Sequence, residues 1–231
     1  MKPLPEVRAA ADALAALTDD LDVLRGLEIL SEAAVALIPS VIGVSLTIVV
    51  DGEPFTVTAT DEATGAVDAV QYLDGGPCLD AASDQDAIMV GDLLDEERWQ
   101  LYRDAVSPSG VRASLSLPLG GAGGPIPGAI NLYAAEPHAF KGKERLLAEA
   151  FQTPAEDFIT NADLSFMTRE AARRLPEQME DKAKVDQATG MLSVMLGWSP
   201  DEARTRLRAA AGKAGTPVSK VADLLITMTI A

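Results

Sequence analysis

The hydrophobic pattern of this chain changes near Lys141, and the change limits what the chain can fold into. Before this point, short runs of alternating and β-branched residues predict strands over residues 45–50, 55–59, 113–119 and 129–134. The pair Asp51-Gly52 predicts a tight turn between the first two strands. After Lys141, apolar residues recur every three or four positions, which is typical of helices.

The first 160 residues are therefore predicted to form an α+β domain. A helix with apolar residues three or four apart precedes the first hairpin and ends near Pro39. The region between the two hairpins shows no sustained period and is expected to be irregular. The Gly-rich segment 120–125 leads into a strand rather than a helix, which favours a hairpin connection over a phosphate-binding loop. These elements predict an antiparallel sheet with flanking helices gathered on one face.

The helical pattern of residues 141–197 predicts a long connecting helix that only Pro154 and Pro176 interrupt. If fully helical, it would approach about 85 Å at a rise of about 1.5 Å per residue. Proline kinks or ends a helix, so both prolines are candidate joints. Because a helix of this length can pair with its copy in a second chain, a homodimer is expected.

The last quarter of the chain carries well-marked helix boundaries. Ser199 is followed by Pro200 and, at the third helical position, by Glu202, which is a capping box. Gly215 ends this helix, and Thr216-Pro217 opens the next. This part is expected to form a compact three-helix unit.

The formal net charge of -16 is unevenly distributed. Residues 1–167 hold 9 basic and 27 acidic side chains, a net charge of -18, whereas residues 168–231 hold 10 and 8, a net charge of +2. The chain-wide average argues against a nucleic-acid partner, because carboxylates repel phosphates, yet it describes neither part. The asymmetry predicts two domains with different partners, and an acidic domain that repels RNA from its neighbour until a signal separates them.

The single cysteine, Cys78, excludes an intramolecular disulfide, and the chain has too few Cys and His residues for a structural zinc site. A buried structural thiol is the favoured interpretation of Cys78, with a redox sensor or a bilin attachment point as alternatives. His138, the one histidine, is expected in a surface loop rather than as a haem ligand. Nucleophile and base pairs are correspondingly scarce, so we expect neither an enzyme nor a cofactor.

The N-terminal sequence lacks the apolar core of a signal peptide, and no run of about 18 apolar residues predicts a membrane span. A cytoplasmic protein that does not bind a membrane is therefore expected.

Three features follow one another in order near the end of the chain: Asp186-Gln187-Ala188-Thr189-Gly190, the capped helix that follows Ser199, and the pair Val221-Ala222. In these residues the C-terminal part resembles the ANTAR domain, an RNA-binding three-helix module of bacterial transcription antitermination regulators. The resemblance implies stem-loop RNA in leader transcripts as the partner. The family pattern usually has Arg at Lys182, Lys at Thr189 and an apolar or aromatic residue at Arg204, so the chain departs from it at these positions.

The element Gly75-Gly76-Pro77-Cys78, followed by Asp92-Leu93, Arg98-Trp99 and the segment 110–119, resembles a GAF domain. The resemblance covers residues from about 20 to 160 and agrees with the predicted order of strands. It implies a sensor for an unidentified small-molecule or protein signal. By position in the family, its ligand pocket is expected to involve Tyr72, Cys78, Asp92, Trp99 and Ser114.

The residues expected to contact RNA lie on the first two helices of the ANTAR-like part and are Lys182, Gln187, Thr189, Gly190, Arg204, Arg208 and Lys213. Helical spacing places Lys182, Asp186 and Thr189 on one face, and Arg204 and Arg208 on a shared face of the next helix. Since Trp198 is the only aromatic residue in this part, recognition is expected to rest on charge and shape rather than base stacking.

These predictions divide the chain into a GAF-like sensor domain (1–160), a helical connector (161–177) and an ANTAR-like RNA-binding domain (178–231). The leading hypothesis is a cytoplasmic antitermination regulator in which a signal at the sensor controls binding of hairpin RNA. The alternative is a signalling adaptor whose GAF-like domain binds a protein or small molecule and whose ANTAR-like domain has lost RNA binding, a possibility that Thr189 and Arg204 motivate.

Overall fold

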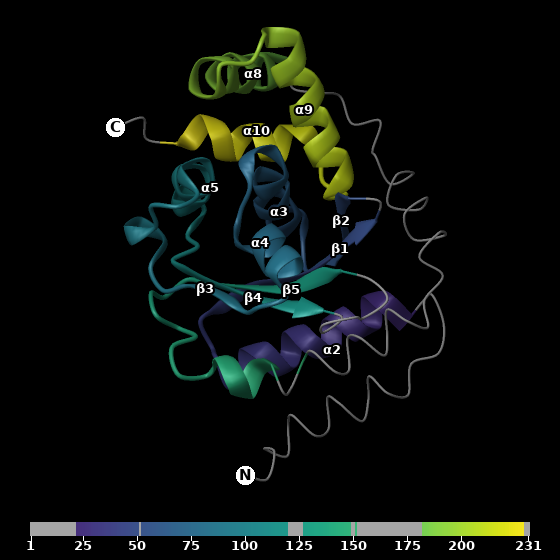
Figure 1. The fold of residues 1–231 in the computed structure, drawn as a ribbon, viewed down its shortest axis with the longest axis vertical. Coiled ribbons are helices and arrows are strands. Elements are labelled where there is room, and N and C mark those ends of the chain that lie inside the picture. The colour runs from purple at the N-terminus through teal and green to yellow at the C-terminus, as the bar shows by residue number, and fades with distance from the viewer. Residues whose placement is uncertain (1–21, 51, 120–126, 149–150, 152–181, 229–231) are drawn as a thin grey trace.

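The computed structural model describes residues 22–50, 52–119, 127–148, 151 and 182–228. These residues form an antiparallel five-stranded sheet with helices on both faces and a three-helix unit stacked above one face (Figure 1). The predicted α+β class and antiparallel sheet are confirmed. The expectation that all helices gather on one face is wrong, because both faces of the sheet are buried.

The sheet has the strand order β2-β1-β5-β4-β3. The strands are β1 (Val41–Val50), β2 (Glu53–Ala59), β3 (Ile88–Val90), β4 (Ala113–Leu119) and β5 (Gly128–Ala134). Both predicted hairpin pairs are present as antiparallel neighbours, β1 with β2 and β4 with β5. The two hairpins join through β1 and β5, where Ser45 lies opposite Asn131. Gly52, in the first turn, has a φ of 81°, a conformation that glycine adopts without strain.

Alternation along the strands gives the sheet one apolar and one polar face. Val44, Leu46 and Ile48 of β1 point to the apolar face, together with leucines and an isoleucine of β4 and β5. Helix α2 (Asp22–Leu37) covers this face with Leu30 and Ala34. Phe140, Leu147 and Phe151 complete the same cluster, so the segment after β5 also packs here.

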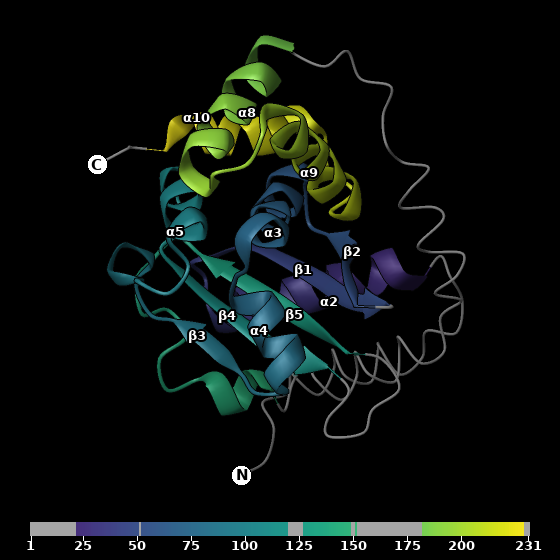
Figure 2. The same ribbon diagram turned by 45° about the horizontal axis from the view of Figure 1, so that its top comes forward.

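The opposite face of the sheet is covered by α3 (Glu62–Asp74) and α4 (Pro77–Asp84) (Figure 2). The region between the hairpins was expected to be irregular, but it also contains β3, η1 (Leu93–Asp95), α5 (Gln100–Val106) and η2 (Ser107–Ser109). Helix α3 escaped prediction because it is buried on more than one side, so its apolar residues do not follow a single stripe. Its start is marked by Asp61, whose carboxylate accepts the N–H of Thr64 at 2.7 Å.

The C-terminal three-helix unit consists of α8 (Lys182–Leu196), α9 (Pro200–Lys213) and α10 (Val218–Thr227). The predicted cap of α9 is confirmed, since the Ser199 hydroxyl accepts the N–H of Glu202 at 3.2 Å. Thr216 does not cap α10: Pro217 is the N-cap residue, and the Thr216 hydroxyl donates to the backbone oxygen of Glu62 at 2.9 Å. The turn between α9 and α10 is thus tied to α3 of the sheet domain.

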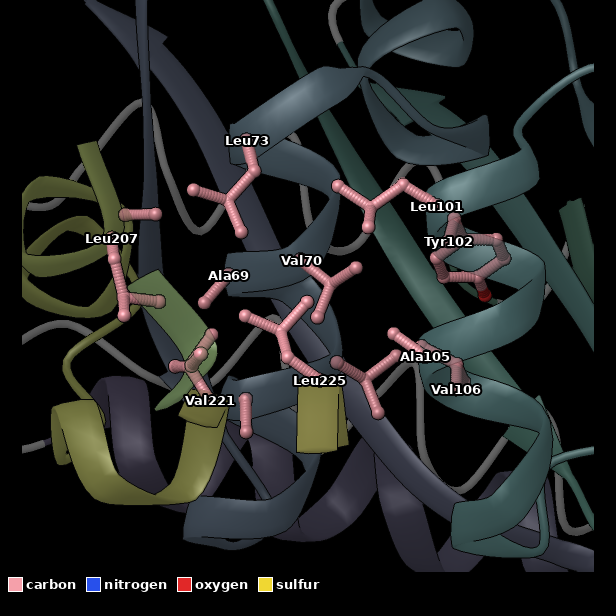
Figure 3. Packing of buried hydrophobic residues seen from close by; sticks show 14 of the residues in the cluster. Ala69, Val70, Leu73, Leu101, Tyr102, Ala105, Val106, Leu207, Val221 and Leu225 are labelled. Carbon is pink, nitrogen blue, oxygen red and sulfur yellow. The ribbon is translucent and has the colours of Figure 1, made fainter. Parts of the chain in front are cut away.

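The three-helix unit and the sheet domain share one hydrophobic core. Figure 3 shows Val221 and Leu225 of α10 beside Ala69 and Val70 of α3, with side chains of α5 on the other side. Leu225, Val221 and Val70 are completely buried. The two parts of the chain therefore pack as a continuous body, although the charge pattern divides them.

Several predictions fall outside the described residues. They are the connector 161–177, the prolines at 154 and 176, the Gly-rich segment 120–125 and most of the long helix predicted over 141–197. In the part of the chain that the structure describes, no helix is long and apolar enough to cross a membrane. The same part contains no group of three or more His, Cys, Asp or Glu residues that could hold a metal ion.

Candidate functional site

A buried carboxylate lies at the centre of the polar face of the sheet. Asp68 projects from α3 and is completely buried. Its Oδ1 accepts hydrogen bonds from the Tyr133 hydroxyl at 2.5 Å and the Ser45 hydroxyl at 3.0 Å, and its Oδ2 accepts one from Thr56 at 2.9 Å. Because β5, β1 and β2 each supply one hydroxyl, Asp68 joins α3 to three strands of the sheet.

A second set of contacts extends this polar network along β1. The Tyr72 hydroxyl lies 3.1 Å from the Thr47 hydroxyl and 2.7 Å from that of Thr56. The Asn131 amide donates to Ser45 and Thr47, at 3.1 Å in each case. The Asn131 Oδ1 atom is buried and has no hydrogen-bond partner among the described residues. An unsatisfied buried acceptor is costly, so this atom is where a donor from a ligand or a water molecule would be favoured.

Gln71 connects the network to the start of α4. Its Nε2 donates to the Tyr133 hydroxyl at 3.0 Å, and its Oε1 accepts the backbone N–H of Cys78 at 2.8 Å. A Cβ atom at Gly76 would lie 2.5 Å from the same Oε1. Gly76 of the Gly-Pro-Cys element is therefore required for packing, because only glycine leaves room for the Gln71 side chain.

Burial controls the ionisation of this site. It raises the pKa of Asp68 from 3.8 to about 6, although the hydroxyls of Tyr133, Ser45 and Thr56 act in the opposite direction. Burial and the nearby charge of Asp68 raise the pKa values of Tyr72 and Tyr133 well above the usual value of 10.0. The two phenols thus remain protonated at neutral pH and act as hydrogen-bond donors.

Cys78 is buried and free, as the interpretation of a structural thiol requires. Burial raises its pKa well above 9.0, and the charges of Asp68 and Asp80 act in the same direction. A thiol with a high pKa and no access to solvent is a poor nucleophile.

We expect Cys78 in the folded protein to react with iodoacetamide at pH 8 at least about a hundredfold more slowly than in urea, since only the thiolate reacts and opening is required first. Mass spectrometry over a time course checks this. Rapid labelling of the native chain would argue for an exposed redox cysteine instead.

The structure brings together only some of the residues predicted to form a ligand pocket. Tyr72 belongs to the polar network, Cys78 is joined to it through its backbone, and Ser114 lies on β4 opposite Tyr133. Asp92 does not belong to it: it pairs with Arg112 at 2.7 Å, and this hydrogen bond lowers its pKa. Trp99 also lies outside the network, where its Nε1 donates to Asp80 at 3.2 Å.

Most of the residues that form the network were not predicted from the sequence: Ser45, Thr47, Thr56, Asp68, Gln71, Asn131 and Tyr133. A usable signal was present, because polar residues alternate with apolar ones in Ser45-Leu46-Thr47 and again in Asn131-Leu132-Tyr133. Alternation is normally taken to indicate a solvent-facing side. Here the polar side is covered by α3, so it forms an interior polar site instead.

The second candidate site lies on the outer surface of the three-helix unit. Lys182, Gln187 and Gly190 are exposed on α8, and Arg208 is exposed on α9. A Cβ atom at Gly190 would meet nothing within 4 Å, so a partner can approach the α8 backbone there. Arg204 links the two helices through a 2.6 Å ion pair with Asp186.

Two predicted RNA contacts are not placed on this surface. Thr189 has only 2% of its surface exposed, and its hydroxyl donates to the backbone oxygen of Val185 at 2.6 Å. The expected face of Lys182, Asp186 and Thr189 is thus wrong for Thr189, which turns inward with the apolar residues. Lys213 lies at the far end of α9, where its ammonium group pairs with Glu53 of β2. The other predicted RNA contacts lie on the outer surface; they are Lys182, Gln187, Gly190, Arg204 and Arg208.

The structure also places two residues outside these sites. Lys184 forms a 2.7 Å ion pair with Asp223 of α10, so it lies toward α10 rather than on the outer surface of α8. His138 is exposed in the turn after β5, as expected for a surface residue.

Comparison with solved structures finds distant likenesses. A domain of a protein described as a two-component sensor histidine kinase from Sinorhizobium meliloti 1021 is 18% identical, with a TM-score of 0.45, covering 66% of this chain and 96% of that one. A free methionine-R-sulfoxide reductase from Thermoplasma acidophilum is 14% identical, with a TM-score of 0.41 and coverage of 72% and 96%. At these TM-scores the likenesses carry no argument about function.

The chain matches two family models. The GAF domain model matches residues 25–160, and the ANTAR domain model matches residues 173–226. A search of curated proteins finds no match. The first match spans the sheet and its flanking helices, and the second includes α8 and α9 and most of α10. The chain therefore belongs to the GAF domain family and is a GAF and ANTAR domain-containing protein.

Proposed function

We propose that this protein is a non-enzymatic, cytoplasmic antitermination regulator whose ANTAR domain binds hairpin RNA under the control of its GAF domain. The combination of a sensor-type and an RNA-binding-type domain supports this proposal. The observation that carries it furthest is that Lys182, Gly190 and Arg208 remain on the exposed surface of the ANTAR domain while α10 lies between α8 and the GAF domain (Figure 1).

The chemistry of this surface favours a structured RNA. Its basic side chains supply phosphate contacts, and the open backbone at Gly190 permits a close approach of a folded loop. The one aromatic side chain of the domain, Trp198, is occupied by Arg206, whose guanidinium carbon lies 4.3 Å from the ring centroid. Stacking of unpaired bases on this ring is therefore disfavoured, and duplex backbone and loop shape become the features to recognise.

In the GAF domain we propose the polar network as the place that receives the signal. Asn131 Oδ1 offers an unsatisfied acceptor, and the Asp68 carboxylate offers a negative charge, both beneath α3. A small polar molecule with N–H or O–H donors matches this arrangement. We further propose a homodimer, which would present two ANTAR domains to paired stem loops and strengthen a weak single contact.

Ultraviolet crosslinking of the protein in cells, followed by sequencing of the bound RNA, tests the function. Enrichment of tandem stem loops in leader transcripts supports the regulator. If no RNA is recovered above background, the protein is better described as a signalling adaptor with an ANTAR domain that no longer binds RNA.

Arg208→Ala should weaken binding of a stem-loop RNA severalfold and reduce the slope of log affinity against log salt by about 1, because one phosphate contact is lost. Arg206→Ala is the matched control: it removes the same charge from α9 at a position outside the expected RNA contacts, where the guanidinium pairs with Glu202 at 2.8 Å and stacks on Trp198. Fluorescence anisotropy at four salt concentrations measures both slopes. Equal slopes for the two variants would contradict a phosphate role for Arg208.

A further inference from the structure

The GAF and ANTAR domains are in close contact where the α9–α10 turn crosses the first turns of α3. A Cβ atom at Gly65 would lie 3.1 Å from the backbone oxygen of Ala214 and 3.4 Å from Cβ of Thr216. Contact this tight at a backbone atom leaves no room for a larger side chain. Gly65 thus permits the turn to rest directly on the helix.

Polar contacts hold the turn at the same place. The Thr216 side chain, only 1% exposed, donates to the backbone oxygen of Glu62 at 2.9 Å. Lys213 pairs with Glu53 at the start of β2. This ion pair lowers the pKa of Glu53, mainly through the hydrogen bond from Lys213. We call these residues, Glu53, Glu62, Gly65, Lys213 and Thr216, the docking clamp.

The clamp includes Lys213, which is one of the residues expected to contact RNA. Lys213 has its charge paired with Glu53, a carboxylate of the GAF domain. Arg204, by contrast, pairs with Asp186 inside the three-helix unit. An opened clamp would therefore add a cation to the RNA-binding surface and remove an acidic residue from its neighbourhood.

Helix α3 carries both the clamp and the polar network, because residues three apart on a helix lie on neighbouring faces. Asp68 follows Gly65 by three residues on α3. Its carboxylate accepts hydrogen bonds from the hydroxyls of Ser45 and Tyr133, which lie on two strands of the sheet. A ligand that rearranges these hydrogen bonds would therefore act on α3 itself. The same helix supports the α9–α10 turn, so the two sites share one rigid element.

We propose that the docking clamp is an autoinhibitory contact that withholds Lys213 from RNA, and that signals received beneath α3 act by opening it. The inference rests on the proposed RNA-binding function. In the closed state the protein binds RNA through its outer surface alone, with the acidic GAF domain fixed beside it. In the open state Lys213 joins the RNA-binding residues, and affinity rises.

Two full-length variants test the clamp, each with a matched control. Glu53→Gln removes the partner of Lys213, while Glu28→Gln removes the same charge from exposed α2 on the far face of the sheet. Gly65→Leu inserts a side chain between α3 and the turn, while Ala63→Leu adds the same side chain at an exposed position of the same helix. Hydrogen exchange of residues 212–216 and the affinity for a stem-loop RNA are measured for all four.

We expect exchange of residues 212–216 to be faster in Gly65→Leu than in Ala63→Leu, with the sheet strands unchanged. Glu53→Gln should bind RNA about two- to fivefold more tightly than Glu28→Gln at low salt, since an exposed ion pair holds Lys213 only weakly. Adding Lys213→Ala to Glu53→Gln should abolish the gain.

Unchanged exchange at residues 212–216 in Gly65→Leu would overturn the clamp. Equal affinities of Glu53→Gln and Glu28→Gln, or a gain that survives Lys213→Ala, would overturn the role of Lys213. Failure of the proposed function is distinguishable, because no variant would then bind RNA while the exchange rates still showed whether the turn had been displaced. A structural interface without a regulatory role would show faster exchange in Gly65→Leu and no gain in RNA affinity in any variant.

Discussion

Leu225→Ala is expected to lower the free energy of unfolding of the entire chain by about 2–5 kcal/mol. Leu225 lies on α10 of the ANTAR domain, is completely buried, and belongs to the cluster that contains Val70 of α3 and Val106 of α5 (Figure 3). Truncating it leaves a cavity between the two domains. Because the core is continuous, the loss should destabilise both domains together rather than the ANTAR domain alone.

The two tryptophans of the chain allow this result to be measured separately in each domain. Trp99 lies in the GAF domain and Trp198 in the ANTAR domain. Urea unfolding followed by fluorescence, in Trp99→Phe and Trp198→Phe backgrounds, should give coincident transitions that Leu225→Ala shifts by the same amount. Val194→Ala, at a position that is 86% exposed on α8, is the control and should change stability by less than about 0.5 kcal/mol. A shift of the Trp198 transition alone would show that the domains unfold independently.

The second large effect is expected from Asp68→Asn, as a function of pH. Burial raises the pKa of Asp68 from 3.8 to about 6, so the folded state binds this proton more tightly than the unfolded chain does. The stabilisation that results is complete below about pH 3.8 and is lost as the pH rises through about 6. The asparagine variant lacks this titration. The stability of the variant relative to the wild type should therefore rise by up to about 3 kcal/mol between pH 4 and pH 7.

Asp92→Asn supplies a control of opposite sign. The hydrogen bond from Arg112 lowers the pKa of Asp92, so this carboxylate stabilises the fold above its unfolded pKa and loses that effect as the pH falls. The stability of Asp92→Asn relative to the wild type should consequently fall with rising pH. Urea unfolding at half-unit pH steps measures both differences. A flat profile for Asp68→Asn would contradict the buried, high-pKa carboxylate.

The elements that the sequence predicted correctly are those whose signals are local. The turn at Gly52 and the cap at Ser199 depend on neighbouring residues only, so strands β1 and β2 and the start of α9 were predicted. Strands β4 and β5 were predicted because the alternation of residues along each of them is also a local signal. Helix α3 was not, because burial on more than one side removes the amphipathic stripe that marks a helix.

The candidate sites divide in the same way. Exposed positions such as Arg208 and Gly190 could be named from motif and helical spacing. Thr189 was assigned to the wrong side of α8, since a threonine can satisfy its hydroxyl on the backbone four residues earlier and so enter a core. Asp68 drew no attention among the 35 acidic residues, because nothing local distinguishes a carboxylate that the fold will bury.

The sequence by itself determined the two families, the division between an acidic and a slightly basic part, and most of the strands and helices, because these depend on local order and composition. Only the tertiary structure decided that the two parts share one core, that the polar sides of β1, β2 and β5 lie side by side beneath α3, and that Lys213 pairs with Glu53. Each of these joins residues far apart in the chain. Such contacts follow from how packed helices and strands bury apolar surface, a property that no local pattern records.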